Sequence, residues 1–115
     1  MRVLLKRAYA PPARSDGLRI LVDRLWPRGV SKADAGIDLW LKDVAPSAAL
    51  RRWFGHDPQK WAEFRTRYRA ELHGSPALAE LKALARKGDV TLVYSARDEL
   101  HNDAVVLREV LERGA

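Results

Sequence analysis

The chain has 115 residues, of which 47% are hydrophobic and 31% charged, and it contains no cysteine. This length predicts a single domain over residues 1–115, and the lack of cysteine excludes disulfides, thiolate chemistry and the usual structural zinc sites. The net charge of +6 at pH 7 permits an anionic partner such as nucleic acid but does not require one.

No apolar run in the sequence is long enough for a membrane helix, and the apolar part of the first residues, "MRVLLKRAYAPPA", is too short for a secretory signal. We therefore expect a soluble, cytoplasmic protein without membrane contact. No repeat or low-complexity tract interrupts the chain, so one core should suffice.

The first half of the chain begins with two predicted strands. Residues 2–9 and 18–26 are rich in branched apolar residues and are separated by the turn-forming stretch "PPARSDG". This connection is shorter than a parallel crossover normally needs. If the two strands are neighbours, the sequence therefore favours an antiparallel pair.

Three helices are predicted between the second strand and residue 88. Ser47 can cap the first, which ends at Gly55. Asp57 precedes Pro58 at the start of the second, and Ser75 precedes Pro76 at the start of the third, which ends at Gly88. The apolar residues on their inward faces are Leu50, Trp53 and Phe54, then Trp61, Phe64, Tyr68 and Leu72, then Leu78, Leu81 and Leu84.

Residues 90–94, "VTLVY", predict an interior strand with helices on both sides, because both of its faces are apolar. A last helix follows, with Leu100, Ala104, Leu107 and Leu111 on one stripe. The long helical connection predicts that residues 18–22 and 90–94 are parallel neighbours. The predicted fold class is α/β, with a three- to four-stranded mixed, mainly parallel sheet covered by helices. Residues 30–46 fit a strand, in which Ile37, Leu39 and Leu41 alternate, as well as a short helix.

Polar side chains follow both central strands. In open α/β sheets ligands bind beyond the carboxyl ends of the strands, and "DRLWPRG" and "SARDELHND" would emerge there together. We predict a cleft at that edge, with at least one arginine paired to Asp23 or Asp98. The candidate ligand-binding residues are Asp23, Arg24, Trp26, Arg28, Lys42, Asp43, Ser95, Arg97 and Asn102. Their arginines favour an anionic small molecule, because guanidinium groups bind carboxylates and phosphates with two hydrogen bonds.

Candidate catalytic residues are His101, His56 and Asp98. A histidine is the usual general acid or base near neutral pH, and Asp98 or Asp57 would orient it. The same residues have structural interpretations. Ser95 and Asp98 have the spacing of a helix capping box, and Arg97 and His101 have the spacing of a surface pair on a helix.

Several common chemistries are absent from the sequence. There is no Walker motif, G-x-G-x-x-G, H-E-x-x-H or G-x-S-x-G. No metal or cofactor is therefore predicted.

The stretches "KRAYAPP", "DRLWPRG", "KDVAPS", "WFGHD" and "ARDELHN" together resemble the YeaO-like family of bacterial proteins, also described as domain of unknown function 488. The resemblance spans nearly the whole chain, with no departure at these motifs. It implies a compact, cytoplasmic α/β protein and carries no established reaction. Some relatives have transcriptional-regulator labels, although no stretch here is typical of a helix-turn-helix.

The sequence leaves three functions open. The first is a small-molecule site, enzymatic or not. The second is a nucleic-acid-binding module, favoured by the pI of about 10.1 and by the arginines of "RRWFGH" and "EFRTRYR", although acidic residues alternate with the latter. The third is a protein-interaction or structural role. The sequence predicts no oligomeric state.

Overall fold

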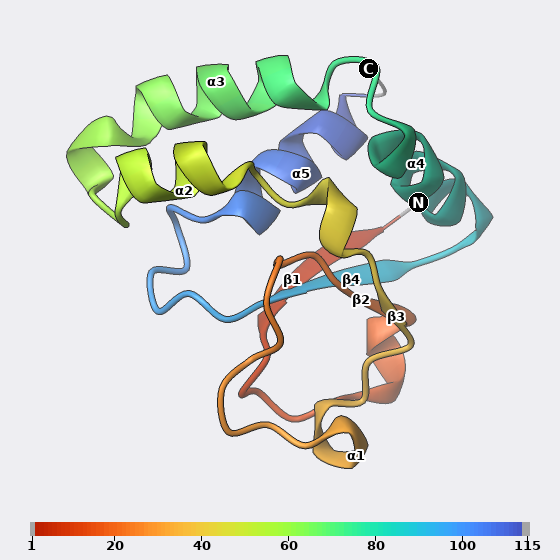
Figure 1. The fold of residues 1–115 in the computed structure, drawn as a ribbon. Helices are drawn as coiled ribbons and strands as arrows, with labels where there is room; N and C mark the ends of the chain where they lie inside the picture. Colours follow the sequence, from red (N-terminus) through yellow and green to blue (C-terminus); the bar gives the residue numbers. More distant parts are fainter. Residues whose placement is uncertain (1, 114–115) are drawn as a thin grey trace.

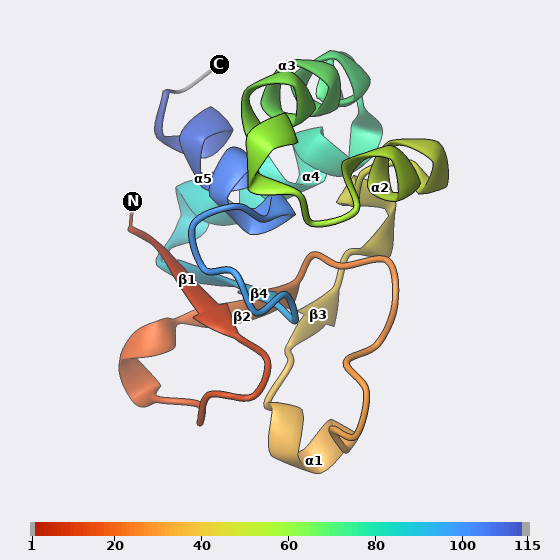
Figure 2. The ribbon, with the colours of Figure 1, turned by 90° about the vertical axis from the view of Figure 1, so that its left-hand side faces the viewer.

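The computed structural model describes residues 2–113. Its centre is a four-stranded sheet with the order β1-β4-β2-β3. The strands are β1 (Val3–Arg7), β2 (Leu18–Leu21), β3 (Leu39–Trp40) and β4 (Val90–Tyr94). All three pairings are parallel, so their carboxyl ends lie at one edge (Figures 1 and 2).

The predicted parallel pairing of the two central strands is confirmed, with Leu18 opposite Val90 and Leu21 opposite Val93. The first two strands are not neighbours, because β4 lies between them and both are parallel to it. Their short connection turns sharply at Gly17, which has a φ of 65°. A Cβ atom there would lie 2.2 Å from the carbonyl oxygen of Asp89, so only glycine allows β2 to begin this close to β4.

Four helices pack on one face of the sheet: α2 (Ala48–Phe54), α3 (Trp61–Leu72), α4 (Pro76–Lys87) and α5 (Asp103–Glu112) (Figures 1 and 2). The predicted caps are confirmed, since Ser47 and Ser75 accept hydrogen bonds from the N–H groups of Leu50 and Leu78. Asp57 caps a single 3-10 turn, Pro58–Lys60, that leads into α3. The main core joins this face of the sheet to the helices through residues such as Ile20, Leu92, Phe64, Tyr68, Leu81 and Leu107.

Within residues 2–113, no long helix covers the other face of the sheet, contrary to the expectation that helices cover both sides of β4. Irregular segments, the one-turn helix α1 (Lys32–Ala35) and the 3-10 turn Arg14–Asp16 cover it instead. A small apolar cluster of Ala8, Leu21 and Val93 lies there, with Trp26 and Ile37 against it. Both faces of β4 are nevertheless fully buried, which explains its continuous apolar sequence.

A buried cluster of charged side chains holds these irregular segments together. Asp16 binds Arg19 at 2.7 Å and Lys6 at 2.8 Å, while Arg19 also donates to the carbonyl oxygens of Ala35 and Gly36. Burial by itself would raise the pKa of Asp16, but its hydrogen bonds with Lys6, Ala13 and Arg19 outweigh that effect and lower it to about 2.

Two predicted segments need revision. The ambiguous region contains both candidate structures in succession, with β3 followed by a 3-10 turn at Lys42–Val44. The last helix begins at Asp103, with Asn102 as its N-cap. Leu100 therefore lies before the helix and is 73% exposed, so its predicted place on the buried stripe is wrong.

Candidate functional site

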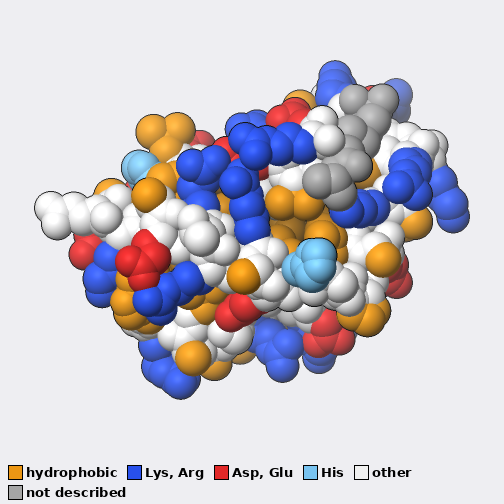
Figure 3. Space-filling view, turned by 90° about the horizontal axis from the view of Figure 1, so that it is seen from above, with side chains coloured by type: hydrophobic (Ala, Val, Ile, Leu, Met, Phe, Trp, Pro, Cys, Tyr) orange, Lys and Arg blue, Asp and Glu red, His pale blue; other side chains and the backbone are white. Residues whose placement is uncertain are grey.

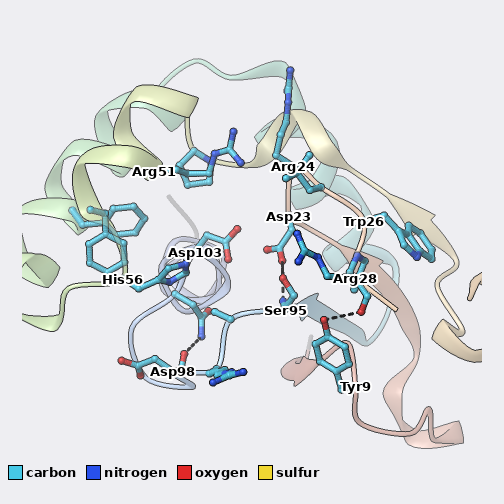
Figure 4. A pocket seen from close by; sticks show the side chains of 18 residues that line it. Tyr9, Asp23, Arg24, Trp26, Arg28, Arg51, His56, Ser95, Asp98 and Asp103 are labelled. Carbon is cyan, nitrogen blue, oxygen red and sulfur yellow. Dashed lines mark hydrogen bonds between the residues drawn. The ribbon is translucent and has the colours of Figure 1, made fainter. Parts of the chain in front are cut away.

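A cavity of about 790 Å³ opens beyond the carboxyl ends of β2 and β4, bordered by α2, α3 and the start of α5 (Figure 4). Val22 donates its N–H to the carbonyl oxygen of Val93 as the strands end. Asp23 lies in the loop after β2, and Ser95 lies in the loop after β4. The two residues are in direct contact. Asp23 Oδ2 accepts hydrogen bonds from the Ser95 N–H and the Ser95 hydroxyl, each at 2.8 Å.

Most of the predicted site residues border this cavity. They are Asp23, Arg24, Trp26, Arg28, His56, Ser95, Arg97, Asp98 and Asn102. Trp26 is held by a hydrogen bond from its indole nitrogen to the carbonyl oxygen of Val30 and by edge contact with Trp40. The parallel pairing of β2 and β4 explains why loops so distant in sequence meet here.

Three predicted residues do not border the cavity: Lys42, Asp43 and His101. Lys42 lies over the ring of Trp40, and Asp43 makes an exposed ion pair with Arg24 at 3.2 Å. Both residues belong to the 3-10 turn after β3, and both side chains are exposed on the surface outside the cavity.

His101 is paired with Asp98, with 2.8 Å between Nδ1 and Oδ2. This hydrogen bond is the main reason why the pKa of Asp98 is lowered. The predicted contact that would orient an imidazole is therefore present. The ring of His101, however, packs edge-on against Trp61 with 5.2 Å between centroids, so the imidazole lies outside the cavity.

The predicted ion pair between an arginine and Asp23 or Asp98 is wrong for the part of the chain that the structure describes. Asp23 is held by Ser95 instead, and Asp98 by His101 and by the N–H of Leu100. The capping interpretation of Ser95 is also wrong, because Asn102 caps α5 while Ser95 binds Asp23.

Sequence reasoning missed Tyr9, Arg51 and Asp103 in the cavity wall, together with apolar residues such as Phe54 and Phe64. Asp103 is the first residue of α5; placing the helix start correctly would have pointed to it. Arg51 lies on α2, four residues before Gly55. Tyr9 lies in the loop after β1, and its hydroxyl donates to the carbonyl oxygen of Arg28. Nothing in their sequence pattern distinguishes these two residues from ordinary surface groups.

The carboxyl groups of Asp23 and Asp103 face one another in the middle of the pocket (Figure 4). Burial raises the pKa of Asp103 well above its usual range, and the charge of Asp23 and a hydrogen bond between the two side chains add to that rise. Two carboxylates at such close quarters cannot both ionise easily. The raised pKa of Asp103 makes it the member that keeps its proton, beside an Asp23 that accepts two hydrogen bonds from Ser95.

Three arginines of the pocket, Arg28, Arg51 and Arg97, form no ion pair within residues 2–113. Arg28 and Arg51 enter the pocket from different sides (Figure 4). The Nε atom of Arg51 is buried and has no hydrogen-bond partner in the described part of the chain. Unpaired buried donors are uncommon in folded proteins.

His56 borders the pocket from the loop after α2. Its φ is 57°, and Gly55 before it has a φ of 54°. Only His56, among the described residues other than glycine, has a positive φ. Such a conformation is strained and tends to occur at functional sites. Asp57 does not orient the His56 ring, because its side chain caps the N–H of Gln59.

The described residues contain no group of three or more metal-ligating side chains placed to hold an ion. Within the same residues, no helix has the length and apolar character that crossing a bilayer requires.

Comparison with known proteins gives consistent matches over the whole chain. A family model described as "Inactive DUF488-N3 subclade" matches residues 2–115. The uncharacterized protein Rv3073c of Mycobacterium tuberculosis is 46% identical over 110 residues, which cover 96% of this chain and 93% of the relative. The uncharacterized protein YeaO of Escherichia coli is 44% identical over 112 residues, which cover 96% of this chain and 97% of the relative. No solved structure gives a significant match.

Proposed function

The chain belongs to the YeaO-like family that the DUF488-N3 model describes, and for the pocket of this fold we propose the binding of an anionic small molecule without chemical turnover. The observation that carries the proposal is the set of pocket arginines without acidic partners. Arg28, Arg51 and Arg97 border one cavity and are not neutralised by ion pairs among residues 2–113.

Several arginines elsewhere in the molecule are paired with acidic side chains. Arg19 pairs with Asp16, Arg65 and Arg69 pair with Glu109, and Arg67 pairs with Glu63. A phosphate or carboxylate group in the pocket would satisfy guanidinium groups that the protein leaves open. The half-buried position of Arg51 strengthens this attraction, because charges interact more strongly away from bulk water.

Two observations support binding rather than catalysis. Of the two histidines predicted as general acid or base, His101 lies outside the cavity, and no carboxylate among residues 2–113 is bonded to His56. The matching family model is also described as inactive. The volume of about 790 Å³ is in the range that small-molecule pockets occupy.

Isothermal calorimetry with inorganic pyrophosphate and citrate as probes tests the proposal, using Arg51→Gln and Arg52→Gln. Arg52 is the matched control, because it lies on the same helix, is exposed and does not border the pocket. Loss of one charge-assisted hydrogen bond costs about 1.5–3 kcal/mol, so Arg51→Gln should weaken binding by about tenfold or more. Equal effects of the two substitutions, or no binding of either probe, would overturn the proposal.

A further inference from the structure

The pocket keeps its positive and negative groups apart. Within the described residues neither Asp23 nor Asp103 forms an ion pair with Arg28, Arg51 or Arg97, although all five border one cavity. Oppositely charged side chains that are free to move normally pair. Here the strand ends and helices hold them separately, with the two carboxyl groups in the middle and arginines entering from the sides (Figure 4).

Asp23 and Asp103, the acid pair of the pocket, each use only one carboxyl oxygen for hydrogen bonds to Ser95 or to the backbone. Asp23 uses Oδ2 for both bonds from Ser95. Asp103 uses Oδ1 for the N–H of Ala104, at 2.9 Å. Apart from the hydrogen bond between the two carboxyl groups, no N–H or hydroxyl donor among residues 2–113 bonds to Asp23 Oδ1 or Asp103 Oδ2.

A carboxylate beside a neutral carboxylic acid offers an acceptor and a donor together. A hydroxyl group matches both, because it can take the place of the hydrogen bond between the two side chains, donating to Asp23 and accepting from Asp103. An anionic group does not match, because the charge on Asp23 repels it. A metal ion is also a poor match, since no third His, Cys, Asp or Glu side chain accompanies the pair in the described chain.

We infer that the pocket selects an anion that also carries hydroxyl groups, such as a phosphorylated or acidic sugar or polyol, with the hydroxyls at Asp23 and Asp103 and the anionic group at the arginines. This inference rests on the proposed function. The stacked rings of Phe54 and Phe64, with centroids 4.3 Å apart, also border the cavity, and they offer an apolar surface to the C–H groups of such a ring.

The selection can be measured with two phosphates of similar size. Glucose 6-phosphate has the hydroxyls, whereas cyclohexylmethyl phosphate has none. Calorimetry near neutral pH should give an affinity for glucose 6-phosphate that is about tenfold or more higher, as expected when hydrogen bonds to charged groups are present in only one complex.

Variants of Asp103 test whether the preference for glucose 6-phosphate depends on Asp23 and Asp103. Asp103→Ala removes the donor and should bring the two affinities to within about threefold. Asp103→Asn retains a donor and an acceptor and should keep most of the preference. Asp34→Asn is the matched control, because Asp34 is an exposed acid in the first turn of α1. Circular dichroism establishes that each variant is folded.

The outcomes separate the two proposals. If neither phosphate binds, the proposed anion site fails, and this inference fails with it. If both bind with equal affinity and Arg51→Gln weakens both, the anion site stands and the hydroxyl selection is wrong. A preference that persists in Asp103→Ala would also overturn the assignment to the acid pair.

Discussion

Asp23 and Ser95 join the ends of the two central strands, through two hydrogen bonds of 2.8 Å to one carboxylate oxygen. These bonds hold Asp23 at the base of the pocket, next to Asp103. The pKa of Asp103 is raised, mainly by burial, so Asp103 keeps its proton beside Asp23. This arrangement has consequences for stability as well as for binding.

Asp103→Asn should stabilise the protein near neutral pH. Burial and Asp23 raise the pKa of Asp103 well above the ordinary value of 3.8. The folded protein therefore binds this proton more tightly than the unfolded chain does, and the free energy of unfolding falls as pH rises from 3.8 towards the folded-state pKa. Asparagine does not titrate, so the variant avoids this loss.

Urea denaturation of both proteins at about pH 4 and about pH 8 measures the difference. We expect similar stabilities at the lower pH and a more stable variant at the higher one. A variant that is less stable than the parent at the higher pH would show that Asp103 is stabilising as a carboxylate.

His56→Gly should stabilise the protein and weaken ligand binding. Glycine adopts a positive φ without steric strain, so removing the side chain at a φ of 57° should raise the free energy of unfolding by about 1 kcal/mol. Binding of pyrophosphate should weaken because the ring borders the pocket. His73→Gly is the control, since His73 has an ordinary φ of −61° and lies outside the pocket. If His56→Gly lowers the free energy of unfolding, the backbone at His56 is not strained, and the prediction is wrong.

Asp16→Asn should destabilise the protein without changing the pocket. The pKa of Asp16 is lowered from 3.8 to about 2, which corresponds to about 2 kcal/mol of stability that is present above pH 3.8 and lost as pH falls towards 2. Denaturation near neutral pH should show this loss, and calorimetry should show unchanged pyrophosphate binding. An unchanged free energy of unfolding would mean that the ion pairs of Asp16 contribute nothing net.

Binding to nucleic acid should be weak and nonspecific. Arg65, Arg67 and Arg69 of α3 are paired with acidic residues, and basic side chains on the helical face are interspersed with acidic and apolar ones (Figure 3). A surface making about six phosphate contacts would lose about a thousandfold in affinity between about 50 and about 200 mM salt. Titration of fluorescent duplexes at both salt concentrations measures this. Tight, sequence-selective binding at the higher concentration would favour the regulator interpretation.

The sequence predicted the central part of the fold because its signals are local or topological. Caps such as Ser47 and Ser75 are read from adjacent residues, and the long connection before β4 implies a parallel partner. The second face of the sheet escaped prediction because irregular segments cover it. Their position depends on a buried contact between Asp16 and Arg19, and such a pair has no periodic signature.

For the candidate site, the sequence predicted which loops meet but not which atoms pair. Parallel strands bring Asp23 and Ser95 to one edge, as the strand order requires. Arg51 and Asp103 could not be assigned in the same way, because their positions depend on how α2 and α5 are placed against the sheet. His101 was misplaced since its contact with Trp61 joins segments whose packing the sequence does not specify.

Backbone amide shifts in an NMR titration with inorganic pyrophosphate test the central claim, anion binding at the strand ends, most directly. We predict saturable shifts confined to the loop that begins at Asp23, the middle of α2 around Arg51 and the segment from Ser95 to Asp103. The exposed basic residues of α4, Arg86 and Lys87, should not shift in the same range of concentration. Shifts spread over α4 and the other basic surfaces, without saturation at the pocket, would contradict the account.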